Sequence, residues 1–254
     1  MRKVELMEIL QWAAKRFQPE LLQQVRNKLD VRELKLLDYV FEKYYREDKM
    51  TGRWYDPYHI LISTDFALRL AGLSPLIIPA IILHDIGYKA IPDKDTGWNT
   101  KHSRIVHMQE GAALAAGDLV RVGGLSSEEI EVIVGIVASH DNLILGIPVN
   151  NPTRLALIDA DRVWVMHFIS FWKDFVSEAG HPEDLSPSDL LKLRHDKFYE
   201  VNIPLTDLAK LWRGEQFKVR LQEIEDNIVE SEEMFRQYAE KHLQAELNGL
   251  RDGL

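Results

Sequence analysis

The sequence predicts an all-α protein, a helical bundle, from three observations. Apolar residues recur at the three- and four-residue spacing of amphipathic helices through most of the chain. Proline and capping residues mark the expected helix starts. No segment shows a convincing alternation of apolar and polar residues, as a half-buried strand would. With 254 residues, 46% of them hydrophobic, the chain is long enough to bury a substantial core.

The first expected helices lie in residues 1–50, which predict two or three amphipathic helices. The pair Asp56-Pro57 has the form of an N-cap followed by proline in the first turn. It predicts a helix that reaches Leu70 and carries His59 in its first turn.

Ser74-Pro75 repeats this pattern and predicts a helix that ends at His84-Asp85. Adjacent side chains on a helix diverge by about 100°, so these two can converge on one point only near a helix end. Gly87 is expected to supply that end as a left-handed C-cap.

A polar loop, which we expect to act as a lid, follows over residues 90–100. A helix of small residues is expected over 102–120, where Gly111, Ala112 and Ala113 would let a neighbouring helix approach closely.

Two further helices are expected before the C-terminal region. Ser126 and Glu129 form a capping-box pattern for a helix that ends near His140. Asn151-Pro152 predicts the start of a helix that runs to about residue 178.

Composition excludes several classes of function. The formal net charge of −9 gives no basic footprint for a nucleic-acid polymer. The chain has no cysteine, so any metal must bind to nitrogen and oxygen. No stretch of 18 apolar residues occurs, and charged residues interrupt the first 17. We therefore expect a cytoplasmic protein without a membrane span or signal peptide.

The residues that could carry chemistry are histidines and aspartates that fall on, or at the end of, separate predicted helices. Helical bundles build metal sites from inward side chains in this way. The candidates are His59, His84, Asp85, His107, His140 and Asp161.

Neighbour analysis favours Asp161 over Asp159 as the last of these ligands. All residues three or four positions from Asp161 are apolar, which predicts that its carboxylate points into the core and needs a partner or a metal. Asp159 lies near Arg162 and is expected to play a supporting role or to face solvent. His107 has a less buried setting than His140, and His102 is its rival.

This ordered set resembles the signature of the HD-domain superfamily of metal-dependent phosphohydrolases. The resemblance covers about residues 55–168. It is carried by His59 in Asp56-Pro57-Tyr58-His59, the doublet in Leu83-His84-Asp85-Ile86-Gly87, His107 in His107-Met108-Gln109-Glu110-Gly111-Ala112, His140 in Ile136-Val137-Ala138-Ser139-His140, and Asp161 in Asp159-Ala160-Asp161-Arg162.

The resemblance implies an all-helical core in which His59, His84, Asp85 and Asp161 bind one divalent metal ion. It also implies that His107 and His140 hold a second ion, with Asp85 as a bridge and the central catalytic residue. A metal-bound water would be the nucleophile that cleaves a small phosphate ester, such as a nucleotide. Ligand type does not distinguish manganese, iron, cobalt, magnesium, nickel or zinc.

Two features differ from the cyclic-dinucleotide branch of this superfamily. That branch has lysine at the position of Tyr88, and it has a tandem His-His-Glu where this chain continues from His140 with Asp141. Hydrolysis of cyclic-di-GMP is therefore not assigned.

Substrate contacts are expected from cations close to the ligands. Lys89, Arg104 and Arg162 are placed where a phosphate could be met, and Tyr88 could donate a hydrogen bond or pack beneath the loop. Two alternatives stay open. One is a di-iron oxygenase, similar to inositol oxygenase, that uses the same ligands, and the other is a non-catalytic ligand-binding module.

The expected organisation has N-terminal helices at 1–50, an HD metal-binding core at 51–180 and a C-terminal helical extension at 181–254, all parts of one compact domain. The one plausible boundary is 180–186. The terminal helices could shape the substrate pocket or form a homodimer face.

Overall fold

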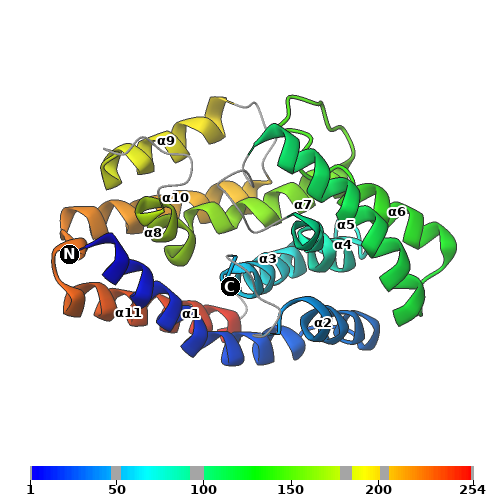
Figure 1. Cartoon of the computed structure of the whole chain (residues 1–254), viewed down its shortest axis with the longest axis horizontal. Helices are drawn as coiled ribbons and strands as arrows, with labels where there is room; N and C mark the ends of the chain where they lie inside the picture. Colours follow the sequence, from blue (N-terminus) through cyan, green and yellow to red (C-terminus); the bar gives the residue numbers. More distant parts are fainter. Residues whose placement is uncertain (1, 47–52, 92–99, 178–184, 201–205, 253–254) are drawn as a thin grey trace. The chain divides into compact units, whose positions relative to one another are not determined.

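The computed structural model describes residues 2–46, 53–91, 100–177, 185–200 and 206–252. Within these ranges the chain forms α-helices and short 3-10 helices and has no strand (Figure 1). The predicted all-α helical bundle is therefore confirmed. No helix in these ranges is both long and apolar enough to span a membrane.

The chain divides into two compact units, Val25–Asp161 and Met1–Gln24 together with Arg162–Leu254. The sequence did not anticipate that the first helix would group with the C-terminal helices. Residues 92–99, the central part of the expected lid, lie outside the described residues, and so do residues 180–184 of the expected boundary at 180–186.

The Val25–Asp161 unit is built around one helix whose residues are all buried. Its elements are α2 (Val31–Tyr44), α3 (Asp56–Leu70), α4 (Ile77–Leu83), η2 (Ile86–Ala90), α5 (Lys101–Val122), α6 (Ser127–Val137) and α7 (Pro152–Arg162). Every residue of α4 is buried, because its sequence is apolar on all sides. Helix α4 packs against α2, α3 and α6, and α5 packs against α6 and η2 (Figure 1).

Gly87 is not the left-handed C-cap that the sequence predicts. The described glycines with positive φ are Gly123, Gly124 and Gly146, whereas Gly87 lies inside η2. A Cβ atom on Gly87 would lie 1.9 Å from the carbonyl oxygen of His107. Glycine is therefore required for close packing of η2 on α5, and Gly111 forms the opposite side of that contact.

Local capping signals give mixed outcomes. The capping box of Ser126 and Glu129 is present at the start of α6. Asp56, however, is not an N-cap. It is the first residue of α3, and both of its carboxylate oxygens accept hydrogen bonds from Arg53 Nε instead.

The helix expected to run from 151 to about 178 is interrupted. Helix α7 ends at Arg162 and is followed by η4 (Val163–Met166) and α8 (Phe168–Val176). His167 has extended backbone angles (φ −63°, ψ 147°), and its Nδ1 accepts a hydrogen bond from the Ile169 amide. This side-chain cap starts a new helix inside an apolar run that by itself suggested continuity.

The other unit contains α1 (Lys3–Arg26), which extends into the Val25–Asp161 unit by its last two residues, together with η4, α8, α9 (Pro187–Glu200), α10 (Asp207–Glu225), η5 (Ile228–Glu230) and α11 (Glu232–Asp252). The Arg236 guanidinium of α11 lies 4.4 Å from the ring centroid of Trp12 in α1. A fully buried carboxylate, Glu223 of α10, accepts hydrogen bonds from Trp172 Nε1 at 2.8 Å and from Arg220 at 2.7 Å.

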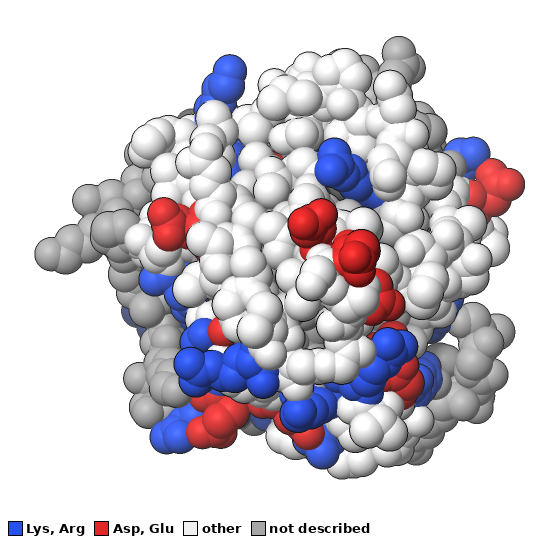
Figure 2. Space-filling view, turned by 90° about the vertical axis from the view of Figure 1, so that its right-hand side faces the viewer, with Lys and Arg blue, Asp and Glu red and all other residues white. Residues whose placement is uncertain are grey.

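The face of the molecule drawn in Figure 2 carries acidic and basic side chains mixed along its lower part. On the described part of that face there is no continuous basic surface, in line with the formal charge of −9.

Candidate metal centre

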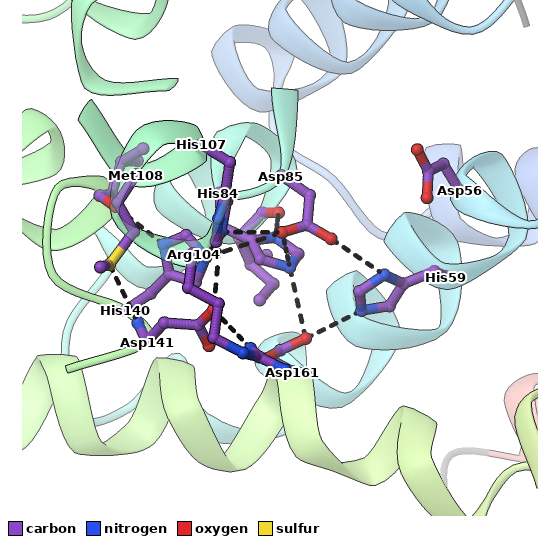
Figure 3. Close-up of polar contacts among 12 residues, drawn as sticks. Asp56, His59, His84, Asp85, Arg104, His107, Met108, His140, Asp141 and Asp161 are labelled. Atoms are coloured by element: carbon purple, nitrogen blue, oxygen red, sulfur yellow. Dashed lines mark hydrogen bonds and ion pairs between the residues drawn. The ribbon is translucent and has the colours of Figure 1, made fainter. Parts of the chain in front are cut away.

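The six predicted ligands meet in the Val25–Asp161 unit, although they come from five different helical segments (Figure 3). Two lie well inside helices, and four lie where a helix ends or nearly ends. They are His59 on α3, His84 and Asp85 between α4 and η2, His107 on α5, His140 in the turn after α6, and Asp161 in the last turn of α7.

Asp85 is shared by two groups of possible ligand atoms. The atoms of His59, His84 and Asp85 all lie within 4.8 Å of one another, and so do those of Asp85, His107 and His140. All five residues are buried. In Figure 3, His59 lies on one side of Asp85, and His107 and His140 lie on the other. These buried groups could hold metal ions.

The two carboxylate oxygens of Asp85 face different imidazoles. Oδ2 lies 3.4 Å from His59 Nδ1. Oδ1 lies 3.5 Å from His84 Nε2 and 3.6 Å from His140 Nε2. It lies 3.8 Å from His107 Nε2. Oδ2 thus faces His59 of the first group, whereas Oδ1 faces His84 of that group and both imidazoles of the second.

Three of the imidazoles are held by their own backbone. The Nδ1 atoms of His84 and His140 lie 2.7 Å from the carbonyl oxygens of Ile81 and Val137, respectively. His107 Nδ1 makes the same kind of contact, at 3.2 Å, with the carbonyl oxygen of Ser103. An Nδ1–H that donates to a carbonyl leaves the Nε2 lone pair as the ligand atom. Each Nε2 then points at the centre.

The contact between His107 and His140 fits a bound cation. Their Nε2 atoms lie 2.9 Å apart, and both are lone-pair atoms if both Nδ1 atoms carry the proton. Two facing lone pairs need a positive charge between them. Nitrogens bound at about 2.0–2.1 Å to one ion and separated by this distance subtend about 90°, which is an ordinary ligand angle.

Asp161 adds a second carboxylate to the group of His59, His84 and Asp85. Its Oδ1 lies 2.8 Å from His59 Nε2 and 3.3 Å from His84 Nε2, and its side chain is 21% exposed. The expectation that Asp159 might face solvent is wrong, because Asp159 is 1% exposed. The residues three and four positions away show which side of a helix is apolar. They do not show which other sides a neighbouring helix covers.

The expectation that His107 has a less buried setting is also wrong. The His107 side chain is fully buried, whereas its rival His102 is exposed. The close packing of η2 on α5 at Gly87 covers His107, and that contact cannot be read from α5 alone.

The carboxylates favour positive charge on the first group. Burial alone would lower the pKa of His59, but its hydrogen bond with Asp161 and its contact with Asp85 raise that pKa to about 9. Burial likewise opposes protonation of His84, and the same two carboxylates still raise its pKa. The two imidazoles lower the pKa of Asp161 against the effect of burial.

In the second group, the pKa values of the two imidazoles, His107 and His140, are shifted in opposite directions. Burial and the neighbouring His140 lower the pKa of His107 to about 4. Burial opposes protonation of His140, but Asp85 and Asp141 raise its pKa. The carboxylates that favour protonated imidazoles could equally hold a metal cation in place of those protons.

The expected substrate residues differ in their placement. Arg104 NH1 lies 2.6 Å from Asp141 Oδ2, and the guanidinium lies between Asp141 and Asp161 in Figure 3. Tyr88 is buried beside the cluster. Lys89 Nζ lies 5.2 Å from the ring centroid of Tyr45.

Arg162 is buried and falls in the other compact unit. Its expected contact with a phosphate therefore stays a prediction.

Sequence reasoning missed two charged residues that contact the ligands, Arg53 and Asp141. Arg53 donates to Asp85 Oδ2 at 2.9 Å and to Asp56. Asp141 Oδ2 lies 3.6 Å from His107 Nε2. The only sequence signals were proximity to Asp56-Pro57 for Arg53 and adjacency to His140 for Asp141, and neither is specific.

Comparisons with protein-family models, with curated proteins and with solved structures found no match to this chain. Its function is therefore inferred from the residues of the centre.

Proposed function

We propose that this chain is a metal-dependent phosphohydrolase that cleaves a small phosphate ester, such as a nucleotide. One observation carries the proposal: two buried His/Asp ligand groups share the carboxylate of Asp85. Divalent ions held by these groups would supply an activated water and would stabilise the attacking and leaving oxygens of an in-line displacement.

The roles of the protein residues follow from their contacts. Asp85 orients the centre, because each of its oxygens faces a different set of imidazoles. Arg104 is the cation best placed to meet a phosphate. Its side chain is 18% exposed and its guanidinium reaches the edge of the cluster at Asp141. Charge-assisted hydrogen bonds from such a fork would orient phosphate oxygens that no metal holds.

The test compares Asp85→Asn with Asp65→Asn. Asp65 is also a buried aspartate, on α3, but it pairs with Lys28 at 2.9 Å and Arg69 at 3.0 Å, outside the cluster. We expect Asp85→Asn to lose bound metal, measured by elemental analysis, and at least about a hundredfold of its phosphatase or phosphodiesterase activity. Asp65→Asn should keep both.

Other outcomes would reassign the centre. Activity that survives complete removal of metal would contradict the proposal. Oxygen uptake by iron-loaded protein, with no phosphate release, would assign the same ligands to di-iron oxygenase chemistry. Tight ligand binding without any product in a broad phosphatase and phosphodiesterase screen would indicate a non-catalytic module.

A further inference from the structure

Arg53 contacts Asp85, which both ligand groups share, and Tyr88, whose ring stacks on His107. We propose that Arg53 is a positioning residue that fixes the bridging geometry of the metal centre. This inference rests on the metal centre proposed above but not on the reaction that the centre performs.

The first contact fixes the carboxylate of Asp85. Arg53 NH2 donates to Asp85 Oδ2 at 2.9 Å. The Nε atom of the same guanidinium donates to both oxygens of Asp56, at 2.8 and 3.0 Å. The Arg53 side chain is 13% exposed and that of Asp56 is 1% exposed. A planar fork held at two edges cannot follow Asp85 if its carboxylate turns. Oδ2 therefore stays on the His59 side.

The second contact fixes the ring plane of His107. The Arg53 guanidinium carbon lies 3.7 Å from the ring centroid of Tyr88. The His107 ring is stacked on Tyr88 with centroids 4.0 Å apart and an interplanar angle of 7°. The Arg53 guanidinium and the His107 imidazole are both too close to the Tyr88 ring to lie on the same face of it. Tyr88 therefore lies between them. Stacking of this kind combines cation–π attraction with packing.

Removal of Arg53 changes the metal affinity in opposite directions for the two roles it could have, positioning of the ligands or a purely electrostatic effect. A guanidinium beside a metal ligand repels a bound cation, so an arginine that acted only through its charge would weaken metal binding. Its removal would then tighten binding. If Arg53 positions Asp85 and His107, its removal weakens binding instead, as loss of an outer partner of a metal ligand typically does by about 10–100-fold.

Mn²⁺ titration of the full chain tests this directly, with calorimetry for affinity and electron paramagnetic resonance for coupling between ions. We expect Arg53→Gln and Arg53→Lys each to lower the affinity of the weakest Mn²⁺ site at least about tenfold. Lysine keeps the charge but lacks the planar fork, so a charge effect alone predicts no change for it. The matched control is Arg69→Gln on α3, which removes an arginine that pairs with Asp65 at 3.0 Å, outside the cluster.

A second pair of variants keeps the test valid if the Arg53 variants do not fold. Tyr88→Phe keeps the ring between Arg53 and His107, and its Mn²⁺ affinity should stay within about threefold of the parent. Tyr88→Leu removes the ring, and the weakest site should lose at least about tenfold.

The outcomes are distinguishable. Unchanged or tighter Mn²⁺ binding by Arg53→Gln, or equal binding by the two Tyr88 variants, would overturn the positioning role and leave the metal centre standing. A parent protein that binds no Mn²⁺ would overturn the metal centre and the role of Arg53 together.

Discussion

His59 lies between two carboxylates, with Nε2 facing Asp161 and Nδ1 facing Asp85. On the proposed function, a proton and a metal ion would therefore compete for this imidazole. Because Asp161 and Asp85 outweigh burial and raise the pKa of His59 to about 9, this imidazole is charged at neutral pH in the absence of metal. A metal ion needs its neutral form.

The expected result is that Mn²⁺ binds more tightly as the pH rises from 6.5 towards 9. Below the raised pKa, each displaced proton costs about tenfold in apparent affinity per pH unit, and the dependence flattens as the pH passes about 9. His107 adds nothing to this dependence, because its pKa of about 4 leaves it neutral throughout the range. Calorimetry between pH 6.5 and 8.5, in buffers of different ionisation enthalpy, measures both the affinity and the protons released.

An affinity that is flat over this range, with no proton release, would contradict the competition at His59. The control is His102→Ala, which removes an exposed histidine on α5 and should leave the pH dependence unchanged.

At the scale of residues, the sequence identified chemical type better than it identified partners. Asp161 could be chosen because a carboxylate among apolar neighbours needs a partner. The contact of Arg53 with Asp85 could not be found, because Asp85 lies 32 residues further along the chain and only the fold brings the two together. Pair contacts between distant segments are not encoded in local spacing.

At the scale of elements, the contact of η2 with α5 sets the geometry of the centre. Gly87 packs against the backbone of His107 and Gly111, so the segment that carries Asp85 and Tyr88 lies directly on the helix that carries His107. A small displacement of η2 would change the separation of the two ligand groups.

Gly87→Ala should therefore destabilise the protein and weaken its metal centre. The added Cβ would meet the His107 carbonyl oxygen at 1.9 Å and the Gly111 nitrogen at 2.5 Å, and backbone atoms cannot move aside cheaply. We expect a loss of about 3 kcal/mol or more in the free energy of unfolding, measured by urea denaturation, together with loss of bound metal.

Gly117→Ala is the matched control for Gly87→Ala. Gly117 also lies in a helix, α5, but a Cβ there meets no atom within 4 Å. The substitution should stabilise the protein by about 0.5–1 kcal/mol, because alanine favours a helix interior. Similar stabilities of the two variants would contradict the close contact between η2 and α5.

The helix boundaries show which parts of the fold are local. The start of α6 was predicted because Ser126 and Glu129 cap it through their own neighbours. The break between α7 and α8 was missed, since an extended residue at His167 interrupts a continuous apolar pattern. Gly87 was correctly marked as special, but for the wrong reason: tertiary packing requires glycine there, not a left-handed turn.

At the scale of the whole molecule, the division into two units assigns the candidate metal centre to one of them. All six candidate ligands belong to Val25–Asp161. The buried Glu223 network belongs to the other unit, where it joins α8 and α10. Metal that binds only the folded form of the Val25–Asp161 unit should stabilise that unit by mass action.

Hydrogen exchange measured with and without Mn²⁺ tests this consequence. At a free Mn²⁺ concentration about 100 times the Kd, the gain is about 2.7 kcal/mol. Amides of α4 and α5 that exchange through opening of their unit should then exchange about a hundredfold more slowly, while amides of α8 and α10 keep their rates. Asp85→Asn should show no Mn²⁺ effect in any segment. An equal gain in α8 and α10 would show that the two units open together, and no gain in α4 and α5 would mean that metal does not bind at the shared carboxylate.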